Sequence, residues 1–371
     1  MSRGVVGDIA AMTLALHEFH EGLNARFAEV NGCEVVNDYG DWLAEHTALR
    51  SAAGVMDLSF RSRICLTGAD RVRLLNGQVT NDVKRLQAGE GCYAALVTAK
   101  GKLQSDLNIF ALADELLLDF EPGFSAAIAE RLEKYIIADD VQVVDASSAY
   151  GLLSVQGPKA ETVVRGVGLT ADIPAKAMGF ATIKDATLGE IYLANHARTG
   201  SAGFDLFAPV GSLGAVMDKL IAAAKEIGGR ACGWQALETA RIEAGVPRFG
   251  ADMDETNLAP EAGIEARAIS YSKGCYIGQE VIARVRTYGQ VTKALRGLKL
   301  PDDLKSLPAR GDKLFHDGKE VGYVTSAATS PVLKNIALGY VRKEVNQIGT
   351  KLTVRAVDGE LAAEIVETPF R

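Results

Sequence analysis

Residues 273–280, Lys-Gly-Cys-Tyr-Ile-Gly-Gln-Glu, concentrate reactive side chains in one short segment. A thiol, Cys275, stands between two glycines, and Lys273 can stabilise the thiolate, which is the reactive form of cysteine. Gln279 and Glu280 add an amide and a carboxylate, and the glycines allow a tight turn or a close approach to a ligand. The pattern indicates a reactive or partner-binding cysteine. The alternative is a small buried hydrophobe in an ordinary turn, which is the commoner case for a lone cysteine.

This segment resembles the signature of the YgfZ-type folate-binding proteins, which help to assemble or repair iron–sulfur proteins. They share their fold with the glycine-cleavage T-protein, a folate-dependent aminomethyltransferase. A second block, Arg-Ile-Glu-Ala-Gly at residues 241–245, resembles the same superfamily, and the whole resemblance spans residues 41–366. It implies a folate-binding accessory protein of iron–sulfur assembly with Cys275 as its functional thiol. Glu243, Lys273 and Gln279 are then expected at the folate site.

The resemblance also implies the cofactor and the partners. The cofactor would be tetrahydrofolate or a derivative. The partners would be folate itself and iron–sulfur client or assembly proteins, with no nucleic acid and no membrane.

A folate-dependent transferase is the second hypothesis. T-proteins carry Gly-Gly-x-x-Asp-Asp between two strands, and residues 101–106 here read Gly-Lys-Leu-Gln-Ser-Asp, which keeps Asp106. The resemblance places this carboxylate beside the folate nitrogens, where it can orient the ring and exchange a proton. Tyr93 and Arg198 match family positions around the pterin, although a strand tyrosine is usually a core residue. On this hypothesis the chain is a tetrahydrofolate-dependent aminomethyltransferase or methyltransferase, and whether it is an enzyme stays open.

Two departures favour the accessory-protein hypothesis over the transferase. Residues 198–205, Arg-Thr-Gly-Ser-Ala-Gly-Phe-Asp, lack the glutamate with which T-proteins bind the pterin. Leu237 stands where the family has a ligand-binding arginine, and leucine cannot make charge-assisted bonds to a folate tail. A third alternative is a scaffold with a vestigial folate cleft.

Composition argues against several classes of protein, among them nucleic-acid-binding, disulfide-rich and membrane-spanning proteins. The net charge is −7 and no Lys/Arg run exceeds two residues, so no nucleic-acid surface is indicated. The five cysteines contain no C-x-x-C pair, which argues against a disulfide framework, a zinc site or a bound iron–sulfur cluster. No metal site is expected. No apolar run approaches the roughly 20 residues that span a bilayer, and a cytoplasmic location is predicted.

The elements that position these residues indicate an α+β fold. Residues 64–75 and 151–164 each read as strand, glycine turn and helix, which suggests duplicated α+β halves. Short strands after residue 297 predict a C-terminal β-barrel. The resemblance completes this as an aminomethyltransferase-like three-domain arrangement.

The predicted division is an N-terminal helical segment (1–50, with helices at 8–31 and 41–50), a first lobe (51–145), a second lobe with the 273–280 segment (146–290) and the barrel (291–371). We expect Tyr93, Asp106 and Arg198 to share one cavity. We also expect Cys275 to lie near its opening.

Overall fold

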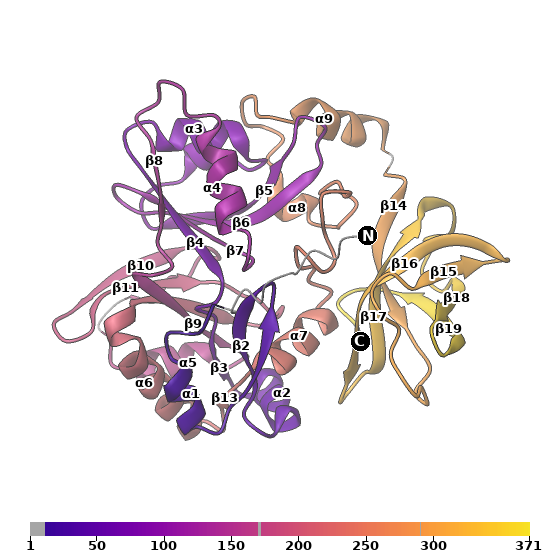
Figure 1. The fold of residues 1–371 in the computed structure, drawn as a ribbon, viewed down its shortest axis with the longest axis horizontal. Helices are drawn as coiled ribbons and strands as arrows, with labels where there is room; N and C mark the ends of the chain where they lie inside the picture. The colour runs from indigo at the N-terminus through magenta and orange to yellow at the C-terminus, as the bar shows by residue number, and fades with distance from the viewer. Residues whose placement is uncertain (1–11, 170–171, 290) are drawn as a thin grey trace, which may run out of the picture.

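The computed structural model describes residues 12–169, 172–289 and 291–371, which form an antiparallel sheet, a mixed sheet, one hairpin and one closed barrel (Figure 1). The predicted α+β class, with a C-terminal β-barrel, is confirmed. In the part of the chain that is described, no helix has the length and apolar character needed to cross a membrane.

The first sheet has the strand order β5-β6-β7-β4-β8, with every neighbouring pair antiparallel. Helix α4 packs its buried residues, Ile128 and Leu132, into the same core as the apolar residues of β4 and β7. The bounds are β4 Ser62–Thr67, β5 Glu90–Val97, β6 Leu103–Ala111, β7 Leu116–Phe120, β8 Gln142–Asp145, α3 Arg71–Gln78, η1 Val83–Arg85 and α4 Ser125–Glu133.

The second sheet has the order β10-β11-β12-β9-β3-β13. Helix α6 covers it with residues spaced three and four apart, from Leu213 through Val216, Met217 and Leu220 to Ala224, which is the spacing of one buried helix face. The bounds are β3 Gly54–Asp57, β9 Tyr150–Gln156, β10 Phe180–Asp185, β11 Gly189–Asn195, β12 Gly203–Pro209, β13 Arg230–Ala231, α5 Ala160–Gly166, η2 Val210–Ser212 and α6 Leu213–Glu226.

The barrel closes in the order β14-β17-β16-β15-β18-β19 and lies to one side of both sheets (Figure 1). The bounds are β14 Lys293–Lys299, β15 Lys313–His316, β16 Lys319–Ser330, β17 Lys334–Arg342, η3 Lys343–Val345, β18 Lys351–Ala356 and β19 Gly359–Val366. The remaining elements are α1 His17–Gly22, β1 Arg26–Val30, β2 Cys33–Asp38, α2 Trp42–Ser51, α7 Trp234–Glu243, α8 Glu265–Ala268 and α9 Gln279–Tyr288.

The two predicted strand–glycine–helix units are β4–α3 and β9–α5. Each turns at a glycine in the left-handed region, Gly68 with φ 94° and Gly157 with φ 129°. A Cβ at Gly68 would lie 2.1 Å from the Asp140 carbonyl oxygen, and one at Gly157 would lie 2.7 Å from that of Ala52. Both turns therefore need glycine for conformation and for space.

The predicted helix over residues 8–31 is wrong where the structure describes it. Its first residues, 8–11, lie outside the described residues. A short helix, α1, is followed by the hairpin β1–β2, which turns at Asn31 and Gly32 with φ 50° and 77°. Two positive φ values at the turn are typical of a type I′ hairpin, for which Asn-Gly is the preferred pair.

The domain boundaries at 50, 145 and 290 stay predictions, but two segments cross them. Strand β3 pairs with β9 and β13 in the second sheet. The segment from Phe249 to Ile282 returns to the first sheet, where Tyr276 and Ile282 pack in one cluster with Tyr93 and Val97 of β5.

Candidate functional site

A cavity of about 370 Å³ lies where the two sheets meet α7 and α8. Its ionisable lining includes five arginines and three carboxylates, so positive charges outnumber negative ones, which suits an anionic ligand. These residues are Arg61, Arg198, Arg241, Arg248, Arg267, Asp106, Glu121 and Glu238. We call this space the central cavity.

Asp106 directs a carboxylate with one buried, unpartnered oxygen into the central cavity. It lies on β6 opposite Ala95 of β5, and Tyr93, two residues before Ala95, donates from its hydroxyl to Asp106 Oδ2 at 2.9 Å. Asp106 Oδ1 is buried and has no hydrogen-bond partner among the described residues. Burial, and then the charge of Glu121, raise the pKa of the Asp106 carboxyl. The free oxygen is thus able to accept a donor from a ligand.

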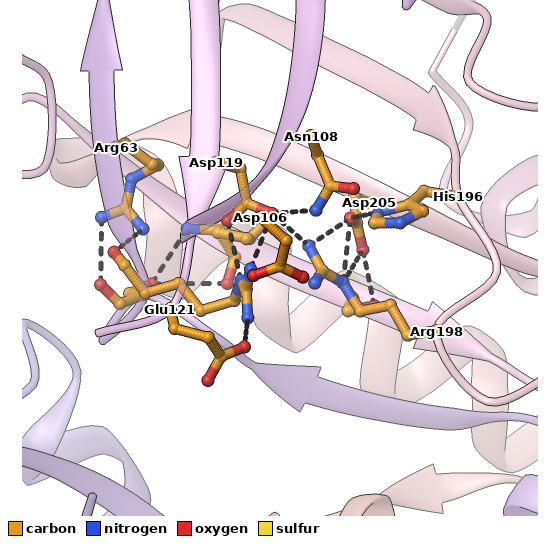
Figure 2. A network of polar contacts seen from close by, with 12 residues as sticks. Arg63, Asp106, Asn108, Asp119, Glu121, His196, Arg198 and Asp205 are labelled. Carbon is orange, nitrogen blue, oxygen red and sulfur yellow. Dashed lines mark hydrogen bonds and ion pairs between the residues drawn. The ribbon is translucent and has the colours of Figure 1, made fainter. Parts of the chain in front are cut away.

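A buried ion network joins the two sheets behind Asp106 (Figure 2). Asp119 of β7 accepts from Arg61 Nε at 2.8 Å and from Arg198 Nη2 at 2.9 Å. Arg198 also donates to Asp205 of β12, at 2.7 Å from Nη2. One guanidinium therefore holds a carboxylate from each sheet.

The charges in this network stabilise one another. Burial opposes the ionisation of Asp205, but the charge of Arg198 and the hydrogen bonds from His196 and Arg198 outweigh it and lower the Asp205 pKa to about 2. The same balance, with Arg61 and Arg198 as the cations, lowers the pKa of Asp119. Burial, and then the charge of Arg198, lower the pKa of His196, so this ring stays neutral near pH 7.

Arginines lie on two aromatic rings at the cavity wall. The Arg267 guanidinium lies 4.4 Å from the centre of the Tyr93 ring, and that of Arg248 lies 4.9 Å from the centre of the Trp234 ring. Leu237 lines the cavity beside Trp234. The site can therefore stack a planar ligand and pair with its negative charge.

The three residues that we expected to share one cavity do line it. Tyr93, Asp106 and Arg198 are all in the central cavity, where Tyr93 and Asp106 are bonded to each other. Arg198 is committed to Asp119 and Asp205, so its guanidinium holds the wall together besides facing the cavity.

Lys273, Cys275 and Gln279 do not line the central cavity. Lys273 Nζ donates to the carbonyl oxygens of Asn76, Val79 and Asn81, each at 2.7 Å. The cation thus caps the end of α3, where carbonyl groups lack partners within the helix. Burial lowers the pKa of the Lys273 ammonium to about 8.

Cys275 is exposed and does not line the central cavity, and its expected place near the opening stays a prediction. Gln279 begins α9 after Gly278, whose φ of 83° places it in the left-handed region. A Cβ at Gly278 would lie 2.5 Å from the Thr98 carbonyl oxygen, so the segment needs glycine to pack on the end of β5.

Glu243 lies at the contact between α7 and the barrel. Its carboxylate accepts from Arg50 Nη1 at 2.7 Å and from the Ser330 hydroxyl at 2.5 Å, with His46 Nε2 at 3.0 Å. These partners tie α2, α7 and β16 together, away from the central cavity.

Arg61, Glu121, Arg248 and Arg267 are cavity residues that sequence reasoning did not single out. One signal was present: the apolar run of β7 is interrupted by Asp119, and a charge in a strand that is buried along its whole length needs a buried partner. Nothing in the sequence says that this partner is Arg198.

Comparison with known proteins gives matches to two domain families that together cover most of the chain. Residues 16–273 match the GCVT N-terminal domain, and residues 293–371 match the glycine cleavage T-protein C-terminal barrel domain. The chain is 30% identical over 359 residues to an aminomethyltransferase of Halalkalibacterium halodurans, covering 96% of both chains. It is 29% identical to the aminomethyltransferase of Bacillus subtilis, covering 96% of this chain and 98% of that one.

A solved structure agrees with these relatives. The crystal structure of glycine cleavage system aminomethyltransferase T from Bartonella henselae superposes with a TM-score of 0.87 at 25% identity, covering 97% of this chain and 98% of that one. The predicted aminomethyltransferase-like arrangement is confirmed.

The predicted function in iron–sulfur assembly is wrong. The curated relatives that match along 96% of the chain are named aminomethyltransferases, and Cys275, on which that prediction depended, does not line the cavity. The match to the YgfZ-type branch therefore reduces to the superfamily that both branches share. With both of its domains matched, the chain belongs to the glycine cleavage T-protein family.

Proposed function

We propose that this chain is a tetrahydrofolate-dependent aminomethyltransferase with Asp106 as its central carboxylate. Its curated relatives bear the name aminomethyltransferase. The observation that carries the proposal is Asp106 Oδ1, a buried acceptor in the central cavity without a partner among the described residues. Leaving such an atom unpaired costs about 1–3 kcal/mol, which a ligand donor would recover.

The cavity fits a reduced folate in size and chemistry. Its volume of about 370 Å³ lies in the range of small-molecule sites. The ring N–H groups of a pterin match Asp106, and the excess of arginine suits the carboxylates of a folate tail. When bound, tetrahydrofolate supplies the nitrogen that accepts the one-carbon group.

Asp106 would hold the pterin and move a proton. With Oδ2 fixed by Tyr93, the free Oδ1 can accept a hydrogen bond from a ring nitrogen. Its raised pKa brings the carboxyl closer to the working pH, which favours both uptake and return of a proton. Tyr93 and Arg198 are proposed as the flanking folate contacts.

The test replaces Asp106 by asparagine in a reconstituted glycine cleavage system that lacks its own aminomethyltransferase. Asp106→Asn keeps the shape of the side chain but cannot take up a proton, so the rate of methylene-tetrahydrofolate formation should fall by about 10²–10⁴-fold. Asp114→Asn, at an exposed position just beyond β6, is the matched control and should retain full activity.

A titration with tetrahydrofolate and its methyl and formyl derivatives separates binding from turnover. The wild-type chain should bind at least one of them and transfer the one-carbon unit. If the chain binds folate but does not transfer the one-carbon unit, it is a folate-binding protein without transferase activity, and the proposal is overturned. Full activity of Asp106→Asn would overturn the role of the carboxylate.

A further inference from the structure

A second cavity, of about 210 Å³, lies between the two sheets and shares no lining residue with the central cavity. One wall is aromatic: Tyr192 of β11 stands opposite Phe207 of β12, and Tyr150 of β9 is their neighbour. The rings of Tyr150 and Tyr192 have their centres 5.6 Å apart at an angle of 34°. We call this space the aromatic cavity.

The opposite wall is aliphatic and the rim is acidic. Cys65 of β4 stands between its strand partners Leu117 and Val144. Directly opposed residues on neighbouring strands face the same side of a sheet, so these three form one surface. Glu115 and Asp145 complete the lining, and none of the described lining residues is a lysine, arginine or histidine.

Of the two carboxylates, Glu115 has more capacity for a ligand. Asp145 accepts from the Ser125 hydroxyl at 3.0 Å and from the Ser147 amide at 2.8 Å. Glu115, by contrast, interacts with Cys65 in the cavity wall. Burial, and then the charge of Glu115 and a hydrogen bond to it, raise the pKa of the Cys65 thiol to about 12.

Two arginines of this region, Arg63 and Arg71, do not neutralise the carboxylates of the aromatic cavity. Arg63 is buried and donates to backbone carbonyls, among them that of Tyr150 at 3.1 Å. Arg71 donates to the carbonyls of Gly68 and Ala113. Neither lines the aromatic cavity.

We infer that the aromatic cavity binds a small organic cation whose nitrogen carries methyl groups, such as a methylated ammonium compound. The faces of aromatic rings attract such cations, and the apolar wall accommodates their methyl groups. The volume is below the roughly 300–1,000 Å³ of sites for drug-sized ligands, so the ligand is small. The negative lining excludes folate, whereas the central cavity carries an excess of arginine.

The two cavities lie back to back across one aromatic residue. Phe110, almost fully buried, has its ring centre 5.8 Å from Phe207 of the aromatic cavity and 6.4 Å from His196 of the central cavity. The two cavities share no lining residue, and we expect each ligand to bind without displacing the other. Val144, 45% exposed, lies at the outer mouth of the aromatic cavity.

Calorimetric titration of the full chain with choline and with 3,3-dimethyl-1-butanol tests the inference. The two probes have the same shape, but only choline is charged. Choline should bind saturably, and the neutral probe should bind about tenfold more weakly, as expected for one cation–aromatic contact. Equal binding of the two probes, or no choline binding, would overturn the inference.

Two variants locate the site. Glu115→Gln should weaken choline binding by roughly tenfold, whereas Glu344→Gln, the same change at an exposed barrel position, should leave it unchanged. Choline should not compete with tetrahydrofolate. Competition, or an unaffected Glu115→Gln variant, would place choline elsewhere and overturn the inference, whatever the outcome for transferase activity.

Discussion

Asp106 and Lys273 each place a buried ionisable group close to a glycine turn, yet the structure uses them in opposite ways. Every donor that Lys273 directs at the protein finds a carbonyl, so the side chain is satisfied by the fold. Asp106 keeps one oxygen without a partner, in a cavity. The difference teaches that a reactive residue type is a weaker sign of function than an unsatisfied buried atom.

The largest effect on stability should come from the network behind Asp106. Arg198→Met leaves Asp119 and Asp205 buried without their shared cation, and the free energy of unfolding should fall by about 3–5 kcal/mol. Urea denaturation at pH 7 measures it. Arg165→Met, which breaks an exposed helix pair with Glu161, should cost at most about 0.5 kcal/mol. Equal losses in the two variants would contradict the network's role.

A smaller loss of stability is expected from a change in the segment at residues 273–280. Lys273→Met leaves three carbonyls at the end of α3 without their donor, so we expect a loss of about 2–4 kcal/mol in the free energy of unfolding. The rate of transfer at saturating substrate should stay at the wild-type value. Lys219→Met, exposed on α6, is the control for loss of a lysine charge. A catalytic defect in a fully folded Lys273→Met protein would give this segment a role in the chemistry.

The pH dependence of transfer should report on Asp106. Its carboxyl must be ionised to accept a proton, and its pKa is raised above the usual 3.8, so activity should fall as the pH drops through that higher value. Because the charge of Glu121 contributes to the rise, Glu121→Gln should move the acidic limb of kcat/KM to lower pH. If the acidic limb of kcat/KM in the Glu121→Gln variant stays at the wild-type pH, a group other than Asp106 produces that limb.

The smallest effect is expected at Cys275. The thiol is exposed and outside the central cavity, so Cys275→Ser should change the free energy of unfolding by less than about 0.5 kcal/mol and leave transfer unchanged. The same assays used for Lys273→Met apply. Lost activity with unchanged stability would restore a functional role to the thiol.

Local patterns in the sequence predicted much of the fold. Both strand–glycine–helix units depend on apolar runs and turn residues that lie close together in the chain. The hairpin β1–β2 carried an equally local signal, Asn31-Gly32, but the surrounding residues were interpreted with the wrong period. The crossing of β3 into the second sheet depends on pairing with residues about 100 positions away, which a local pattern cannot specify.

The site was predictable only in part for the same reason. Asp106 and Tyr93 were found because the resemblance marks them, and their strands are neighbours along the chain. Arg61, Glu121 and Arg248 come together through long-range contacts such as the 3.0 Å pair between Arg248 Nη1 and Glu121. The 273–280 motif misled because Lys273 and Gly278 serve packing against α3 and β5.

Arg198 also determines how the duplicated halves come apart. It pairs with Asp205 of its own sheet and with Asp119 of the other, so separating the sheets would remove one of the two cations of Asp119 and leave this carboxylate with Arg61. We therefore expect the two halves to unfold together, because the unfolding of either half would break the Arg198–Asp119 pair between them.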